Sequence, residues 1–232
     1  APLVEAMSAY KANPCVGFHI PGHNRGKGVL KNFSSLVGED ALNLDTTDEF
    51  DNLGTLFPSS GAIDEAQKLA SSVFGSNRTF FLTGGSSIAN LALAFGLTCP
   101  QDKIIIGRNC HRSVLSGMII SGANPSWLMP KKLDNWAIYG ALDPVDLREQ
   151  LEKNPDTSLV WVTTPTYEGV VSDIEAIARV CHEFDVALIV DEAHGCLWNF
   201  SDVLPKPALK CGADAVVHSL HKTGGSMTQS SM

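Results

Sequence analysis

The feature that most constrains the fold of this chain is the alternation of short apolar runs with helix-like segments after residue 78. Short runs rich in Val, Ile and Leu predict buried strands, and apolar residues spaced three and four apart predict helices. Strands are expected at 78–82, 103–107, 126–129, 158–163, 187–191 and 214–218. Helices are expected at 87–97, 112–121, 143–153 and 173–184, with a shorter one at 206–211.

Apolar strands that alternate with helices indicate the α/β class, with a mainly parallel sheet between two layers of helices. The clearest helix start is Asp143-Pro144-Val145-Asp146, which has an acidic N-cap and proline at the first helical position. Ligands of such three-layer α/β/α sheets bind beyond the carboxyl ends of the strands. Functional residues are therefore expected at those ends.

The N-terminal part of the chain carries weaker signals. A short helix is expected at 2–12, stopped near Asn13-Pro14, and residues 29–60 read as irregular. A helix begins at Gly61 and stops at Gly75. We expect an N-terminal helix-and-loop segment at 1–57 and a cofactor-binding domain at 58–232. No domain-ending signal closes the chain, so we expect this domain to be incomplete at its C-terminus.

Composition excludes several classes of protein. The 232 residues suffice for one large or two small domains. Seventeen Lys and Arg against 25 Asp and Glu give a net charge of −8, which argues against a nucleic-acid binder. No apolar run reaches the roughly 18 residues of a membrane span. Six cysteines without zinc spacing predict reduced thiols, and therefore the cytoplasm or an organelle interior such as a plastid.

Two strand ends carry the chemistry. The run at 214–218 leads into Ser219-Leu220-His221-Lys222, and the run at 187–191 ends in Asp191-Glu192-Ala193-His194. An amine and a carboxylate so placed suit pyridoxal phosphate: the amine forms a Schiff base, and the carboxylate keeps the pyridine nitrogen protonated. Lys222 follows a buried strand with little surrounding charge, which predicts a partly desolvated, nucleophilic amine.

Each of these residues also has a plainer interpretation. Lys222 could be a solvated surface lysine, and Asp191 could pair with a surface base. Residues 191–194 spell the DEAH box of helicases, but no P-loop accompanies it, so an ATPase is rejected. Thr83-Gly84-Gly85-Ser86-Ser87 forms either an anion site at a helix N-terminus or an ordinary Gly-Ser turn. His111 could stack on a flat cofactor or simply contact the helix backbone.

Taken together, the motifs resemble the major domain of the pyridoxal-phosphate-dependent Orn/Lys/Arg decarboxylase family, within the aspartate-aminotransferase-like enzymes of fold type I. The resemblance covers nearly the whole chain. The blocks follow one another in the family's order: 1–6, His19-Ile20-Pro21-Gly22-His23-Asn24-Arg25-Gly26, Thr83 to Ser87, Arg108 to Ser113, Thr164 to Gly169, Asp191 to Gly195, and Ser219 to Thr223. Each block is weak alone, but together they are specific.

The resemblance implies a role for each matching residue. Lys222 would carry the internal aldimine, Asp191 would pair with the pyridine nitrogen, and His111 would stack on the ring. The remaining cofactor contacts would come from Ser86, Ser87, Ser219 and His221 at the phosphate, His194 beside the ring, and Thr166 near the phenolic oxygen. No metal is implied.

The implied activity is decarboxylation of arginine, lysine or ornithine, a small-molecule amino-acid substrate, to the corresponding amine. The family also implies a homodimer or larger homo-oligomer, a further sheet strand and a C-terminal domain after the lysine. Two alternatives stay open: another fold-type I enzyme, such as an aminotransferase or a carbon–carbon lyase, or a truncated module without catalysis.

Overall fold

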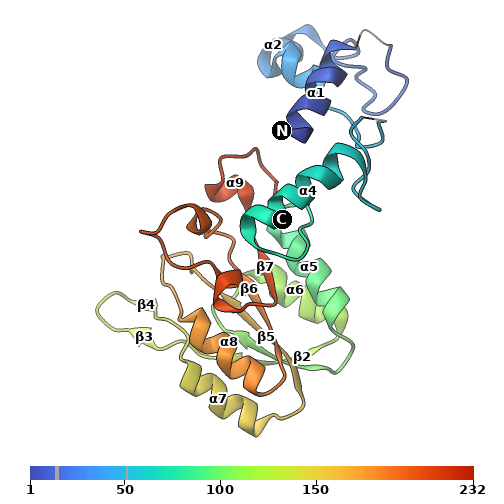
Figure 1. Ribbon diagram of the computed structural model, residues 1–232. Coiled ribbons are helices and arrows are strands. Elements are labelled where there is room, and N and C mark those ends of the chain that lie inside the picture. Colours follow the sequence, from blue (N-terminus) through green and yellow to red (C-terminus); the bar gives the residue numbers. More distant parts are fainter. Residues whose placement is uncertain (14–15, 51) are drawn as a thin grey trace. The chain divides into compact units, whose positions relative to one another are not determined.

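The computed structural model describes residues 1–13, 16–50 and 52–232 (Figure 1). The chain divides into two compact units, Ala1–Thr79 and Phe80–Met232, which are taken separately below. Within the described ranges, no helix combines the length and the apolar character needed to cross a membrane.

The first unit is helical. It contains α1 (Pro2–Ala12), α2 (Lys31–Val37), α3 (Glu39–Leu44) and α4 (Gly61–Phe74). The prediction that 29–60 is irregular is therefore wrong for α2 and α3, which are too short to show a clear apolar period. As expected, α4 ends at Gly75, which takes a left-handed conformation with φ of 76°. Pro14, part of the expected stop after α1, lies outside the described residues. The boundary between the compact units falls after Thr79, and the domain division expected after residue 57 stays a prediction.

The second unit is built on a five-stranded sheet. Its strands are β1 (Lys103–Gly107), β2 (Asn124–Leu128), β5 (Thr157–Thr163), β6 (Ala187–Asp191) and β7 (Ala215–Val217), in the order β2-β1-β5-β6-β7. Every neighbouring pair is parallel. A small antiparallel hairpin, β3 (Lys132–Leu133) with β4 (Ile138–Tyr139), was not predicted.

The longer helices of this unit lie close to their predicted positions. They are α5 (Gly85–Leu97), α6 (Arg112–Ser121), α7 (Pro144–Lys153) and α8 (Ile174–Glu183). Short turns follow at η1 (Trp198–Phe200), η2 (Ala208–Cys211) and α9 (Leu220–Thr223), so the helix expected at 206–211 is a 3-10 turn. The strand expected at 78–82 is wrong: in place of a strand, the described chain has an isolated antiparallel bridge between Leu82 and Ser231.

Side chains alternate between the two faces of the sheet, as the pleat requires. Ile104, Ile106 and Trp161 pack in one buried cluster with residues of α5 and α6. Ile105 and Val160 pack in the other, with residues of α7 and α8. The two helix pairs thus cover opposite faces of the sheet, which confirms the predicted three-layer α/β/α architecture (Figure 1).

Candidate functional site

The pleat continues past the ends of β6 and β7 and sorts the polar residues there. Ile189 packs on the α5/α6 face, so Asp191, two residues on, points to the same face, whereas Glu192 points to the opposite one. At the end of β7, Ser219 likewise points to the α5/α6 face and His218 to the opposite one. Parallel register places Asp191 beside Thr163 and Val217.

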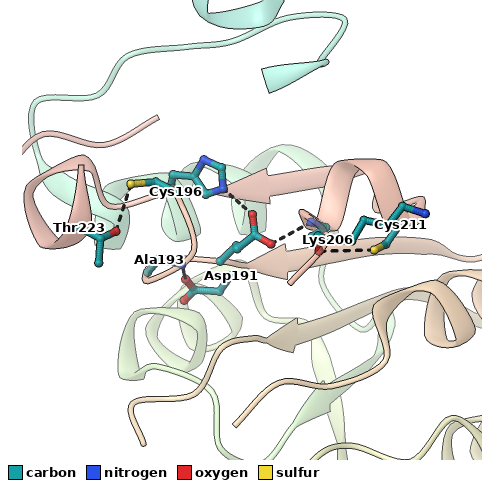
Figure 2. Close-up of polar contacts among 9 residues, drawn as sticks. Asp191, Ala193, Cys196, Lys206, Cys211 and Thr223 are labelled. Carbon is teal, nitrogen blue, oxygen red and sulfur yellow. Dashed lines mark hydrogen bonds and ion pairs between the residues drawn. The ribbon is translucent and has the colours of Figure 1, made fainter. Parts of the chain in front are cut away.

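Asp191 is buried, with 2% of its surface exposed. Its Oδ1 accepts the backbone N–H of Ala193 at 3.2 Å (Figure 2), and its Oδ2 accepts from the amide of Asn90 at 3.0 Å. Two N–H donors suit a carboxylate, which accepts hydrogen bonds but donates none when ionised. The carboxylate of Asp191 is therefore fixed at the end of β6 by one hydrogen bond to each of its oxygens.

Hydroxyl groups gather at the N-terminus of α5. Ser219 Oγ donates to Ser86 Oγ at 2.7 Å, and both residues are buried. Ser87 follows on the same turn and is half-buried. A Cβ added at Gly85, which has φ of 73°, would lie 3.8 Å from Cε1 of His221. The structure thus brings Ser86, Ser219 and His221 together at a helix N-terminus, an environment that favours an anion.

Lys222 lies in α9 with its Nζ 3.2 Å from Nε2 of His194. The lysine is exposed, so the predicted partial desolvation is not found in this chain. The pKa of His194 is lowered, chiefly by burial and then by the charge of Lys222, while Asp191 opposes the shift. A neutral imidazole can accept a hydrogen bond from the ammonium. His194 therefore lies within electrostatic reach of both predicted catalytic residues.

His111 caps the N-terminus of α6. Its Nδ1 accepts the backbone N–H of Ser113 at 3.2 Å and lies 2.7 Å from Ser113 Oγ. The backbone contact considered from the sequence is thus present, while the side chain as a whole is exposed. Its predicted stacking role stays a prediction.

Thr166 is buried in the turn after β5. Its Oγ1 accepts the backbone N–H of Val170 at 3.2 Å. The adjacent Tyr167 is exposed and meets His194 edge to face, with ring centroids 6.3 Å apart. This contact brings the turn to the predicted site, and the role of Thr166 stays a prediction.

Asn90 was missed by the sequence analysis. It is buried on α5, and its amide nitrogen donates both to Asp191 and to Ser113 Oγ, the latter at 2.9 Å. Asn90 lies four residues after Ser86, on the same helical face, which is the one signal that could have identified it.

Glu192 and His218 were also missed as a pair. Glu192 Oε2 lies 2.6 Å from His218 Nε2, and Oε1 accepts the N–H of Ala208 in η2 at 2.8 Å. Both side chains are buried. Close by, Cys196 Sγ contacts Thr223 Oγ1 at 3.1 Å, which ties α9 to the loop after β6 (Figure 2).

Comparison with known proteins places this arrangement in a family. The whole chain, residues 1–232, matches the family described as Orn/Lys/Arg decarboxylase, major domain. It is 38% identical to the arginine decarboxylase of Bacillus subtilis over 231 residues, covering all of this chain and 47% of that protein. It is 28% identical to lysine decarboxylase LdcA of Pseudomonas aeruginosa over 83% of this chain and 28% of that one.

Solved structures agree. Lysine decarboxylase A from Pseudomonas aeruginosa superposes with a TM-score of 0.88 at 25% identity, over 99% of this chain and 34% of that one. The lysine decarboxylase of Francisella novicida gives 0.86 at 27% identity, with the same coverage. The chain spans about half the length of its curated bacillar relatives, 47% in the case above. It belongs to the Orn/Lys/Arg decarboxylase family, of which it matches the major domain.

Proposed function

We propose that the protein decarboxylates a basic amino acid (arginine, lysine or ornithine) to the corresponding amine with pyridoxal 5'-phosphate, which Lys222 binds covalently. The observation that carries the proposal is the buried Asp191, which shares the carboxyl edge of the sheet with the Ser86–Ser219 hydroxyl pair and the Lys222 amine. The family and its named arginine and lysine decarboxylases support the choice of substrate.

The residues present fit this cofactor. An anionic phosphate suits Ser86, Ser87 and Ser219 at the N-terminus of α5, and a protonated ring nitrogen suits the buried Asp191. The acceptor oxygen of Asn90 and the hydroxyl of Thr163 are buried and lack hydrogen-bond partners among the described residues. Both lie on elements that flank Asp191, so polar capacity is left over where a polar ligand is proposed.

When bound, pyridoxal phosphate supplies an electron sink for the bond that releases CO2. Asp191 would hold the proton of the ring nitrogen there, and the two N–H groups that donate to its carboxylate fix its orientation for that contact. His111 would cover one face of the ring, and Thr166 would approach it from the turn after β5. The hydroxyls on α5 would bind the phosphate, aided by His221.

Proton transfer at the lysine falls to His194. Lys222 must lose a proton before its nitrogen can act as a nucleophile. The 3.2 Å contact between Lys222 Nζ and His194 Nε2 provides an acceptor, and the lowered pKa of His194 keeps that acceptor neutral at pH 7. His194 can return the proton at the end of the cycle.

The proposal extends to the whole protein as a homo-oligomer that acts in the cytoplasm on a free amino acid. The test is product analysis with the full-length protein and each of the three amino acids. Release of CO2 with equimolar amine supports the proposal. Formation of a keto acid would instead assign the protein to transamination.

A second experiment examines the lysine. Pyridoxal phosphate added to the full-length protein should give a visible absorbance band, and borohydride should then fix the cofactor on Lys222, as read by peptide mass spectrometry. Lys222→Ala should abolish the band, the label and turnover. A variant that keeps all three would show that a different lysine binds the cofactor.

A further inference from the structure

Four polar side chains form a continuous hydrogen-bonded line across the α5/α6 face of the sheet. It runs from Asp191 to Asn90 at 3.0 Å, from Asn90 to Ser113 at 2.9 Å and from Ser113 to His111 at 2.7 Å. Asp191, Asn90 and Ser113 are buried, and His111 opens to solvent. The line therefore joins the acid proposed for the ring nitrogen to the imidazole proposed for the ring face.

The direction of each hydrogen bond follows from one fixed donor. The backbone N–H of Ser113 can only donate, and it points at His111 Nδ1. This nitrogen must then be an acceptor, so it carries no proton. The Ser113 hydroxyl, which has one hydrogen, donates it to the same nitrogen. Its lone pairs are thus free to accept from Asn90.

Asn90 is oriented by the same logic. Its amide nitrogen has two hydrogens, and these go to Asp191 Oδ2 and to Ser113 Oγ. The reversed amide would set its oxygen against the carboxylate, acceptor against acceptor. In the orientation observed, the Asn90 oxygen is buried without a partner among the described residues. An unsatisfied buried oxygen destabilises a fold, so this side chain does not serve stability alone.

We propose that Asn90 and Ser113 are positioning residues that hold His111 in the tautomer with its proton on Nε2 and aim the Asp191 carboxylate at the cofactor ring. The inference rests on the proposed function for its purpose, but not for its geometry. A neutral His111 adds no positive charge beside a ring that Asp191 keeps protonated. Its Nε2–H remains as a donor on the outer side of the imidazole.

The first test needs no substitution. Neutron crystallography of the full-length protein, with or without cofactor, locates the hydrogens of His111 directly. A proton on Nε2 and none on Nδ1 is the expected result. A proton on Nδ1 overturns the proposal. Since the tautomer is visible without cofactor, this reading stands even if the protein fails to bind pyridoxal phosphate, a failure that would refute the proposed function.

The second test separates positioning from folding. Ser113→Ala cuts the line between Asn90 and His111, and Ser113→Thr restores the hydroxyl. Ser116→Ala is the matched control, since Ser116 lies on the same helix, is exposed and donates only to the carbonyl of Arg112 at 3.1 Å. Cofactor affinity and induced circular dichroism are measured by titrating the full-length apoprotein with pyridoxal phosphate.

Ser113→Ala should weaken cofactor binding about threefold to tenfold, the worth of one hydrogen bond, and reduce the induced circular dichroism. Ser116→Ala should change neither, and Ser113→Thr should recover at least half of the dichroism. Asn90→Leu, which keeps the approximate shape of the side chain, should weaken binding further; because it also removes a donor from the buried Asp191 carboxylate, the melting temperature of the apoprotein is measured alongside. Affinity and dichroism equal to those of Ser116→Ala in both Ser113→Ala and Asn90→Leu would overturn the proposal.

Discussion

Asp191 and Glu192 are adjacent, acidic and buried, yet their surroundings differ because the pleat turns them to opposite faces of the sheet. Asp191 faces α5, where it is part of a line of polar side chains that reaches solvent at His111. Glu192 faces η2, where His218 and the N–H of Ala208 occupy both of its oxygens. The first carboxylate lies where we propose that a ligand binds, and the second closes a packing contact.

The difference shows how a fold divides the two tasks at one strand end. On the α5/α6 face, the oxygens of Asn90 and Thr163 remain without partners among the described residues. On the opposite face, a Cβ at Gly195 would lie 2.4 Å from Glu192 Cγ, so the backbone packs tightly against the Glu192 side chain. Around these two acids, unused polar capacity therefore lies beside Asp191, where a ligand is proposed, and tight packing lies beside Glu192.

The largest effect on chemistry is expected from Asp191→Asn. In the proposed mechanism the ring nitrogen of the cofactor would lose its anionic partner, and removal of a main electrostatic stabiliser typically costs about 3–4 kcal/mol of barrier. Turnover should fall by at least a hundredfold while the protein stays folded, as measured by kcat/KM and by denaturant unfolding. Activity within twofold of wild type would refute the role of Asp191. The two acids would then no longer differ in their importance for the reaction.

Glu192→Ala should give the reverse pattern. It leaves the N–H of Ala208 and the imidazole of His218 buried without their acceptor, which should lower the free energy of unfolding by about 3 kcal/mol. The kcat of the protein that remains folded should change little. Glu192→Gln, which can still accept from Ala208, is the milder control. Loss of turnover in Glu192→Ala without a loss of stability would mean that Glu192 serves the reaction and not the packing of the fold.

Substitution of His194 should change how the free energy of unfolding depends on pH. Its pKa is lowered by burial and then by Lys222, so the folded state favours the neutral ring. The resulting stability is fully present above the unfolded value of about 6.5 and is lost as pH falls through the folded pKa. Denaturant unfolding of His194→Gln should therefore lose less stability than wild type between pH 8 and pH 5.

The same variant should slow cofactor attachment at pH 7 about tenfold, since one hydrogen bond to a charged group is worth about 1.5 kcal/mol. The rate is read from the visible absorbance that develops when pyridoxal phosphate meets the apoprotein. Attachment as fast as in wild type would show that water, and not His194, takes the proton of Lys222.

The sequence predicted the layers of the second unit well because apolar periodicity is local information. The strands around Ile105 and Leu188 are buried on both faces and stand out as continuous apolar runs. The run at 78–82 looks equally strand-like, but a strand forms only where a neighbouring strand pairs along it, and here the ladder is limited to the isolated bridge between Leu82 and Ser231. That information is not local.

For the site too, the sequence predicted what local patterns carry and missed what depends on distant parts of the chain. Asp191 and Lys222 were predicted from the strand ends and from the family resemblance, which name residues but not their contacts. Asn90 was missed because its partners, Ser113 and Asp191, lie 23 and 101 residues away along the chain. The exposure of Lys222 was missed because burial depends on what packs around α9.

The smallest effect is expected from Asp173→Ala, which sharpens the contrast by perturbing only the Glu192 face of the sheet. Asp173 caps α8 by accepting the N–H of Ala176 at 3.0 Å, and α8 packs in the cluster of the Glu192 face. Loss of an N-cap costs about 1 kcal/mol, so the unfolding midpoint in denaturant should fall while kcat stays unchanged. Asp173→Asn, which keeps a capping oxygen, should restore the midpoint. A fall in kcat with Asp173→Ala would mean that the two faces are coupled through β6, and that the carboxylate of Asp191 is held from behind as well as from α5.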